Sequence, residues 1–510
     1  MQYLLTALIL IPVAGTLAAV GHNFAGYKKE SHFRWIALIF SILTFVLSLF
    51  LLQASGGSGW AFAQDVPWIN AIQAHYHVAV DGISLWLVLL TTLLVPISIV
   101  SSWNAVEKRP LAFYAFLLLL ESAMIGVFVS LDVLLFYLFF EASLVPMFFL
   151  IGIWGGDRRV YAATKFFIYT AVGSLLMLAG IITVYIHCHT FDYVLILATL
   201  QQNPIRPDIE FIIFLSFALA FFIKVPLFPF HTWLPDAHTE APTAGSVILA
   251  GILLKMGTYG LMRFNLTLFP ASSHASANVV MVLAVIGIIY GALVAMVQPD
   301  VKRLVAYSSV SHMGFVVLGL FSFTEQGMQG ALYQMLNHGV STGALFLIVG
   351  MIYERRHTRQ ISEFGGLSSS MPWFSAFFVI ASLSSIGLPF LNGFVGEFLI
   401  MHGTWLSTAV QHPWVVTMFA GTGVIWAAVY MLWMLQRVVF GPLKNPANAR
   451  LRDLTPREIG LLAPLLLLML FMGVYPGLFL RRSAESVKIV QHRLESSQSG
   501  GSFAAENLQR

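Results

Sequence analysis

The sequence has a single cysteine, Cys188, among its 510 residues. One cysteine excludes an internal disulfide and is too few for a cysteine-ligated zinc site or an iron–sulfur cluster. The glycine signatures of nucleotide sites are missing as well. No Gly-x-Gly-x-x-Gly run follows a strand-like segment, and no Gly-x-x-x-x-Gly-Lys-Ser/Thr loop occurs. These absences leave iron–sulfur, dinucleotide and nucleotide chemistry without a site in this chain.

Charged residues are also scarce in this sequence. Only 10% of the residues are charged and 58% are hydrophobic, whereas an ordinary soluble domain carries about 25% charged residues. The net charge of +4 is small, and its distribution over the loops indicates an orientation in a membrane and no nucleic-acid partner. The composition therefore predicts that the main solvent of this chain is a lipid bilayer.

Apolar runs recur along the whole chain, each long enough to cross a hydrocarbon core about 30 Å thick. They predict an all-α polytopic membrane protein with about fourteen transmembrane helices. The N-terminus has no basic stretch before its first apolar run, so we expect a retained first helix and no cleaved signal peptide. The predicted spans are at about 3–21, 33–54, 81–102, 111–130, 132–154, 162–187, 209–233, 243–264, 277–298, 303–322, 328–352, 372–408, 413–438 and 458–480.

Two of these spans contain residues that interrupt a helix. The seventh holds Pro226 and Pro229, and the twelfth, which is too long for one straight span, holds Gly387 and Pro389. Proline removes a backbone donor and clashes with the preceding turn. Broken helices at membrane depth are tolerated only where protein or a water-filled cavity satisfies the freed backbone groups. We therefore expect both breaks to mark functional positions.

Lysine and arginine gather in alternate loops. The loops on one side hold only Arg206 and Arg263, and the long loop at about 55–80 holds neither residue type. The positive-inside rule then predicts a multi-pass protein of the bacterial inner membrane with a periplasmic N-terminus and with Cys188 in a periplasmic loop. The basic residues on the predicted cytoplasmic side are Lys28, Lys29, Arg34, Lys108, Arg109, Arg158, Arg159, Lys165, Lys302, Arg303, Arg355, Arg356, Arg359, Arg437, Lys444, Arg450, Arg452 and Arg457.

The C-terminal tail disagrees with this pattern. Fourteen spans place it in the periplasm, yet it carries Arg481, Arg482, Lys488, Arg493 and Arg510. We keep fourteen spans because late C-terminal charges usually yield to the earlier pattern.

The spans divide into two blocks of five helices, and each block has one broken helix in its later part. Because five is odd, the second block enters the membrane upside down relative to the first, which is typical of transporters with a site near the breaks. We predict an N-terminal three-helix segment (1–110), a first repeat (111–265), a second inverted repeat (266–440) and a last helix with its tail (441–510).

Five charged residues lie inside predicted spans, where each costs about 2.5–3.5 kcal/mol on insertion scales. They are Glu121, Glu141, Lys224, Lys255 and Glu397. Burial favours a neutral lysine and a nearby carboxylate favours the charged form, so a Glu141–Lys224 pair of variable spacing would act as a proton switch. Lys255 and Glu397 would continue a relay. The alternative is a set of static interhelical salt bridges, and Glu121 is a possible accessory residue that could simply partner helix 5.

Histidine titrates closest to neutral pH. His312 and His338 fall in helices 10 and 11, between Lys255 and Glu397 in chain order, and could join the two halves of a proton path. The alternative for each is a structural bond to a backbone carbonyl. His231 and His238 flank Trp-Leu-Pro-Asp, and we interpret them as loop structure.

Several runs of sequence are recognisable together. Residues 224–255 begin Lys-Val-Pro-Leu-Phe-Pro-Phe-His-Thr-Trp-Leu-Pro-Asp and continue through Glu-Ala-Pro-Thr-Ala-Gly-Ser-Val-Ile-Leu-Ala-Gly to Lys255. Asp-Gly-Ile-Ser-Leu-Trp begins at Asp81, Leu-Phe-Tyr-Leu-Phe-Phe-Glu-Ala at Leu135, and Asp-Val-Lys-Arg-Leu-Val-Ala-Tyr-Ser-Ser-Val-Ser-His-Met-Gly at Asp300. Over about 80–480 the chain resembles the M-type antiporter-like subunits of proton-pumping NADH:quinone oxidoreductase, respiratory complex I.

The resemblance implies roles for matching positions. It implies that Glu141 and Lys224 form an essential ion pair, that Lys255 is the central relay lysine, and that Glu397 ends the path. It also implies that NADH, FMN, iron–sulfur clusters and quinone bind in sister subunits and that this chain holds no cofactor. The expected partners are other complex I membrane subunits, including the L-type and N-type paralogues.

Three other interpretations remain open from the sequence. The chain could belong to a multisubunit cation/proton antiporter or a membrane-bound hydrogenase, which share the fold but depart in the Glu-Ala-Pro-Thr-Ala-Gly-Ser run. A purely structural membrane scaffold would leave the buried charges beside two helix breaks without a reason. A self-contained redox enzyme would lack ligands, since no clear pairing of histidines across two helices indicates haem.

Overall fold

The computed structural model describes residues 3–27, 29–53, 59–443 and 445–507, with side chains through residue 496. Lys28, Lys444 and Arg510, which entered the orientation argument, lie outside the described residues. Within the described part, twelve helices are long and apolar enough to cross a membrane. The other two predicted spans are the broken ones, so the prediction of an all-α polytopic membrane protein is confirmed.

The N-terminal segment contributes three spans and a hairpin. Its elements are α1 (Leu4–Phe24), α2 (Glu30–Ser48), β1 (Ala61–Ile69), β2 (Ala74–Val80) and α3 (Ser84–Ser101).

The middle of the chain folds into α4 (Pro110–Val129), α5 (Val133–Ala142), α6 (Leu144–Trp154), α7 (Arg159–Cys188), α8 (Tyr193–Gln202), α9 (Pro207–Lys224), α10 (Trp233–Glu240), α11 (Thr243–Ile248), α12 (Leu254–Gly260) and α13 (Leu266–Leu268). Helices α11, α12 and α13 are one continuous span that widens into π turns at Leu249–Leu253 and Leu261–Asn265.

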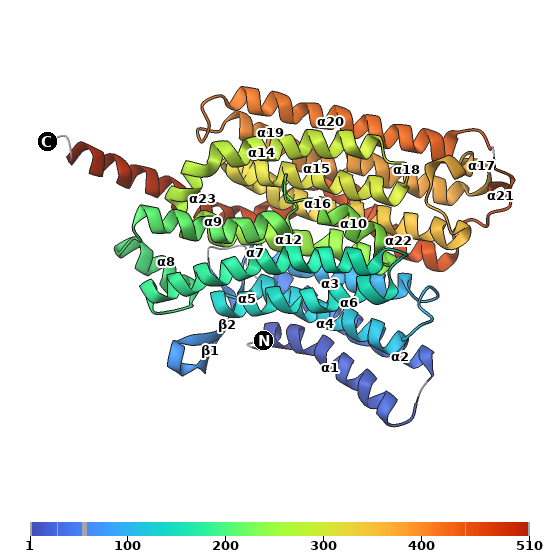
Figure 1. Cartoon of the computed structure of the whole chain (residues 1–510), viewed down its shortest axis with the longest axis horizontal. Helices are drawn as coiled ribbons and strands as arrows, with labels where there is room; N and C mark the ends of the chain where they lie inside the picture. The colour runs from blue at the N-terminus through green and yellow to red at the C-terminus, as the bar shows by residue number, and fades with distance from the viewer. Residues whose placement is uncertain (1–2, 28, 54–58, 444, 508–510) are drawn as a thin grey trace.

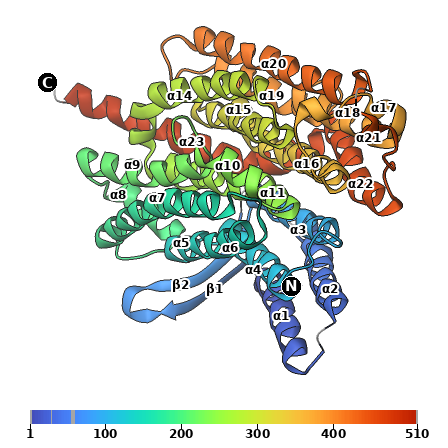
Figure 2. The same cartoon turned by 45° about the vertical axis from the view of Figure 1, so that its right-hand side comes forward.

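The later part contains α14 (Pro270–Met296), α15 (Val301–Phe321), α16 (Glu325–Arg356), α17 (Leu367–Ser370), α18 (Pro372–Ile386), α19 (Asn392–Trp405), α20 (Pro413–Leu435), α21 (Pro446–Ala449), α22 (Pro456–Val474) and α23 (Gly477–Asn507). Figures 1 and 2 show the helices side by side, with α1 and α2 at one edge of the bundle and α20 at the opposite edge. The predicted repeat boundaries stay a prediction.

Both predicted helix breaks occur. Helix α9 ends at Lys224, and α10 resumes the span at Trp233 after the two prolines. Helix α18 ends at Ile386, where Gly387 has a φ of 82°, and α19 begins at Asn392. A positive φ of this size is less costly for glycine than for a residue with a Cβ, which favours glycine at position 387.

The sequence did not predict two elements. The expected loop at about 55–80 contains an antiparallel hairpin, which pairs Ala61 with Val80 and Ile69 with Ala74. The charged tail forms the long helix α23, because Val487, Val490 and Leu494 recur at helical spacing and are buried. Cys188 also differs from its predicted loop position, since it is the last residue of α7.

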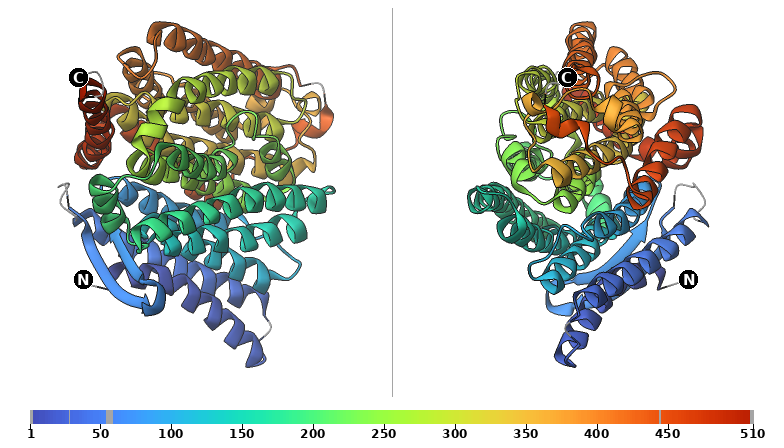
Figure 3. Two further views of the ribbon diagram at one scale, coloured as in Figure 1. Left: turned by 60° about the vertical axis from the view of Figure 1, so that its left-hand side comes forward. Right: turned by 90° about the vertical axis from the view of Figure 1, so that its right-hand side faces the viewer.

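The hairpin and the C-terminal part of α23 lie at the same end of the bundle (Figures 1 and 3). Residues on either side of the hairpin bond to the first turns of α23, because Ser486 Oγ accepts a hydrogen bond from Gly82 N at 3.0 Å and Arg482 donates to the Leu52 carbonyl at 2.8 Å. An even number of spans, as predicted, also places the tail on the same side as the N-terminus.

This arrangement predicts the outcome of cysteine labelling in a Cys188→Ser background. Gln73→Cys in the hairpin turn and Glu495→Cys on α23 should react with a membrane-impermeant thiol reagent from the same side of the membrane. The exposed position of Ala447, at the opposite end, should react only from the other side after the Ala447→Cys change. Labelling of Gln73→Cys and Glu495→Cys from opposite sides would contradict the fourteen-span topology.

Candidate functional site

A series of buried ionisable side chains crosses the later half of the bundle. Lys255 on α12, His338 on α16, His312 on α15 and Glu397 on α19 are all less exposed than 5% of their surface, at 0%, 3%, 4% and 3%. The four helices pack against one another or against the π turn that precedes α12. The structure thus brings together four of the six predicted relay residues. The two histidines lie in the reverse of the predicted order, since His338 contacts Lys255 and His312 contacts Glu397.

Lys255 begins the series with its amine held by two acceptors. Its Nζ lies 2.6 Å from His338 Nδ1 and also donates to the Ala250 carbonyl. Ala250 lies in the π turn at Leu249–Leu253. A π turn displaces the backbone hydrogen-bond ladder and recurs at functional sites. Here the widened turn puts a carbonyl within reach of an amine that would otherwise have a single partner.

The two imidazoles face each other without a direct hydrogen bond. Their ring centroids are 5.9 Å apart, with an angle of 61° between the planes. Because His338 Nδ1 faces Lys255, its other nitrogen, Nε2, is free for the next step, and it is buried with no partner. Proton transfer between these rings therefore requires a bridging water or a ring rotation.

Glu397 ends the series at the second helix break. His312 Nδ1 and Gln334 Nε2 both lie 3.2 Å from Glu397 Oε1. His312 Nε2 lies 3.2 Å from Ser385 Oγ at the end of α18, so this imidazole contacts both halves of the broken helix. A Cβ at Gly387 would come within 2.8 Å of Glu397 Oε2. The carboxylate therefore sits in the space that the break opens.

Glu141 and Lys224 do not form the direct ion pair that the resemblance implied. Lys224 Nζ is buried without a hydrogen-bond partner, as is Oε1 of Glu141. The amine instead faces aromatic rings, 4.8 Å from the centroid of Phe140 and 5.7 Å from that of Phe166. A ring face attracts a cation by its quadrupole. In this structure the nearer of these two rings to the amine is thus that of Phe140, the neighbour of Glu141 in α5.

Of the two histidines interpreted as loop structure, only His238 has different surroundings from those expected. His238 belongs to α10, where it is fully buried and stacked 4.6 Å from Phe346, and neither ring nitrogen has a hydrogen-bond partner. Its interpretation as loop structure is wrong. His231 does precede α10, stacked 5.6 Å from Phe228. Glu121 is fully buried in α4 with both carboxylate oxygens unbonded, and its accessory role stays a prediction.

A buried ion pair escaped the sequence reasoning. Arg263, at the end of the span that carries Lys255, donates to Asp81 at 2.7 Å, and the two side chains are only 4% and 8% exposed. Burial would raise the pKa of Asp81, but the Arg263 guanidinium and Ser84 hold it below its usual value. The sequence pattern places Arg263 in a loop. The signal that could have found the pair was the arginine itself, since it directly follows an apolar run.

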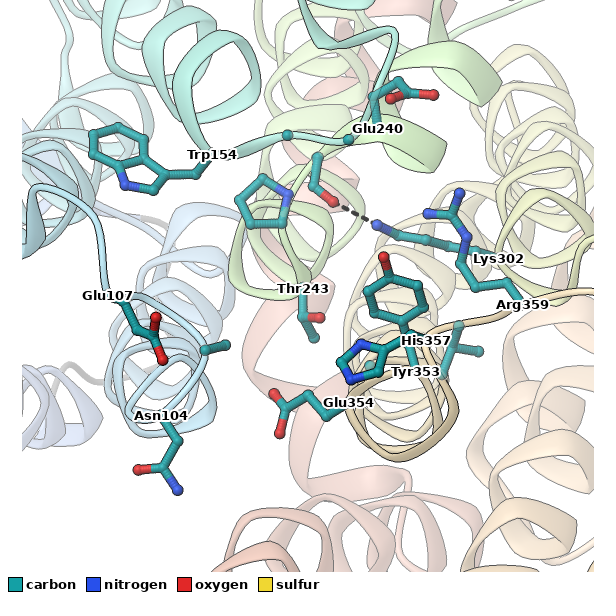
Figure 4. Close-up of a pocket in the computed structure, with 17 residues that line it drawn as sticks. Asn104, Glu107, Trp154, Glu240, Thr243, Lys302, Tyr353, Glu354, His357 and Arg359 are labelled. Carbon is teal, nitrogen blue, oxygen red and sulfur yellow. Dashed lines mark hydrogen bonds between the residues drawn. The ribbon is translucent and has the colours of Figure 1, made fainter. Parts of the chain in front are cut away.

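A cavity of about 570 Å³ opens where α6 and α16 end, and Figure 4 shows side chains that line it. Glu107, Glu240, Glu354, His357 and Arg359 line it. At its wall, Lys302 donates to the Ala241 carbonyl at 2.5 Å. Ala241 follows α10, the half-helix that carries His238. The cavity therefore places ionisable groups beside the end of α10, the second half of the first broken helix.

The fold and the site together define a polytopic membrane transport subunit with a buried chain of proton-binding groups. A family model described as NADH:quinone oxidoreductase/Mrp antiporter, TM, matches residues 130–425. NADH-quinone oxidoreductase subunit M of Rhodobacter capsulatus is 44% identical over 490 residues, which cover 94% of this chain and 94% of that one. The chain belongs to this family of transmembrane subunits, whose general role is proton translocation, and the predicted resemblance to the M type is confirmed.

Solved structures agree with the family. A chain of respiratory complex I from Thermus thermophilus with bound NADH matches with a TM-score of 0.87 and 33% identity, over 96% of this chain and 99% of that chain. A chain of the Mrp complex from Dietzia sp. DQ12-45-1b matches with a TM-score of 0.82 over 96% and 99%, but at 19% identity this likeness is one of fold alone.

The Asp81–Arg263 pair generates a prediction about stability. Removing one partner of a buried ion pair costs about 3–5 kcal/mol because the other charge stays buried and uncompensated. Asp81→Asn and Arg263→Gln should each lower the thermal unfolding midpoint of the assembled protein, and the double variant should lose less than the sum of the two. Arg206→Gln is the matched control, since its pair with Asp208 is exposed at 74% and 68%. Additive losses, or an equal loss in the control, would contradict the structural role of the buried pair.

Proposed function

We propose that this chain is the M-type proton-translocating membrane subunit of a bacterial NADH:quinone oxidoreductase. The observation that carries this proposal is the buried series Lys255, His338, His312 and Glu397, with its helix break at the far end. Family membership and the relative named subunit M support the same function. In this proposal NADH, FMN, iron–sulfur clusters and quinone bind in sister subunits, and the L-type and N-type paralogues are neighbours in the inner membrane.

The contacts of the series give each group a role in proton transfer. A protonated Lys255 donates to His338 Nδ1, with which its Nζ already shares a short hydrogen bond. His338 then releases a proton from Nε2 across the gap to His312. His312 accepts at Nε2, where the proton replaces the hydrogen bond from the Ser385 hydroxyl, and donates from Nδ1 to Glu397 Oε1. A proton thus enters each imidazole at one ring nitrogen and a proton leaves from the other. Neither ring therefore carries more than one positive charge at any step.

Burial makes these groups responsive to one another. Interactions between charges are much stronger in a protein interior than in water, so a charge placed on Lys224 or Lys255 changes the proton affinity of its neighbours. Lys224 faces aromatic rings and has no hydrogen bond to Glu141, and in this proposal that arrangement is the separated state of the Glu141–Lys224 switch. Closing the pair would stabilise the ammonium form. Redox energy from the sister subunits would act on this spacing.

Orientation follows from the loop charges. We propose that the hairpin and α23 face the periplasm and that the cavity lined by Glu107, Glu240 and Glu354 faces the cytoplasm. Carboxylates at a cytoplasmic mouth would gather protons, and α10 connects that mouth to the membrane interior.

A single connected path predicts non-additive losses. Lys255→Ala and Glu397→Ala should each severely reduce proton pumping driven by NADH, and the double variant should lose little more than either one, because residues that act as a unit are non-additive. The measurement is proton uptake into inverted membrane vesicles, normalised to assembled complex. Independent structural salt bridges would instead give additive losses that follow the amount of assembled complex, and that result would overturn the relay.

The switch makes a second prediction. Lys224→Ala should abolish or severely reduce coupled pumping with assembly intact, because the amine has no hydrogen-bond partner that its removal would leave unsatisfied. Glu141→Gln should behave alike, whereas Glu141→Asp should keep part of the activity because it keeps the charge. Equal activity of Glu141→Gln and Glu141→Asp would make the pair structural.

A further inference from the structure

Helix α16 presents a polar stripe to the break between α18 and α19. Gln334, Asn337, His338 and Ser341 recur at spacings of three and four residues, which places them on one face of the helix. All four are at least 97% buried. His338 serves the proposed relay, but Gln334 and Asn337 carry no charge and have no part in it so far.

Gln334 shares an acceptor with the relay. Glu397 Oε1 receives two hydrogen bonds of equal length, 3.2 Å, from His312 Nδ1 and from Gln334 Nε2. The two donors differ in chemistry, because an imidazole N–H is exchanged near neutral pH whereas a side-chain amide keeps both of its hydrogens. When His312 gives up its Nδ1 proton, it stops donating to Glu397, whereas Gln334 continues to donate.

The Gln334 amide is fixed in this orientation. Its Oε1 accepts from Asn337 Nδ2 at 2.9 Å, and the same Asn337 nitrogen donates to the Asn392 carbonyl at 2.8 Å. Asn392 is the first residue of α19, so the amides connect α16 to the start of the half-helix that carries Glu397. A Cβ at Gly396 would come within 2.4 Å of Gln334 Oε1, which makes the contact between the helices close and requires a glycine there.

We infer that Gln334 is a positioning residue for proton transfer to Glu397. It holds Oε1 beside His312 Nδ1 with a donor that is not consumed when the proton moves. During the step, the bond from hydrogen to His312 Nδ1 breaks and a bond from that hydrogen to Glu397 Oε1 forms, while the amide of Gln334 keeps its contact with the same oxygen. The carboxyl group therefore stays oriented with Oε2 toward Gly387 and the helix break. This inference rests on the relay proposed above.

The test compares two identical substitutions on α16 in the complete assembled complex. Gln334→Met keeps the length of the side chain and removes its donor. Gln329→Met is the matched control, since Gln329 Nε2 donates to a different carboxylate, Glu325 Oε1, at 3.0 Å. We expect Gln334→Met to lower NADH-driven proton uptake on the order of tenfold, as for a lost hydrogen bond to a charged group, and the control to leave it near wild type.

Infrared difference spectra add a second measurement, because the carboxyl bands would not move if Gln334 served only in packing. The carboxyl bands assigned to Glu397, by their loss in Glu397→Gln, should move in Gln334→Met and stay in place in Gln329→Met. Gln334→Glu retains length and polarity if the methionine variant assembles poorly; its donor can be lost as a proton, so it should also move the bands and pump less than wild type.

The outcomes separate this inference from the relay itself. Wild-type pumping with unmoved Glu397 bands in Gln334→Met, or in Gln334→Glu where the methionine variant does not assemble, would overturn the role of Gln334. If Glu397→Ala nevertheless loses pumping in the same vesicles, the relay stands and only the positioning role fails. Normal pumping by Glu397→Ala would overturn both.

Discussion

The structure depends on the hydrogen bond between Lys255 and His338. An amine that is fully buried in a membrane protein must be neutral, paired with a negative charge or bonded to acceptors. No carboxylate bonds to Lys255 among the described residues, and its Nζ is held by an imidazole nitrogen and a backbone carbonyl. In the proposed relay this arrangement lets the proton leave Lys255, because a neutral imidazole can accept it, whereas a carboxylate would hold the ammonium in an ion pair.

Three irregular backbone features lie next to the side chains of the proposed relay. A π turn supplies the carbonyl at Ala250, and the break after Ile386 makes room for Glu397. Close approach of α16 and α19 at Gly396 brings Gln334 into reach of the carboxylate. Irregular backbone at membrane depth would be unfavourable in contact with lipid. The π turn at Leu249–Leu253 is buried inside the bundle, whereas Leu388 and Phe390 in the second break are 44% and 77% exposed at its surface.

Sequence reasoning predicted the parts of this protein that have strong local signals. Apolar runs gave the spans, prolines and glycines gave both breaks, and charged residues within apolar helices gave Lys255 and Glu397. The Asp81–Arg263 pair could not be predicted locally because 182 positions separate its members. Gln334 is uncharged, so it lacks the high insertion free energy that singles out a charged residue in a predicted span. The separation of Glu141 and Lys224 depends on where the Phe140 ring packs, and α23 has too many polar residues to resemble a span.

The central claim is that Lys255 and Glu397 belong to one proton path through His338 and His312. Infrared difference spectra of the assembled complex, recorded as NADH reduces it, test that connection directly. If the path is continuous, replacing Lys255 by methionine should suppress the protonation change of Glu397, although the two residues do not touch. A Glu397 signal that is unchanged without Lys255 would contradict the account, because the carboxyl group would then receive its proton from elsewhere.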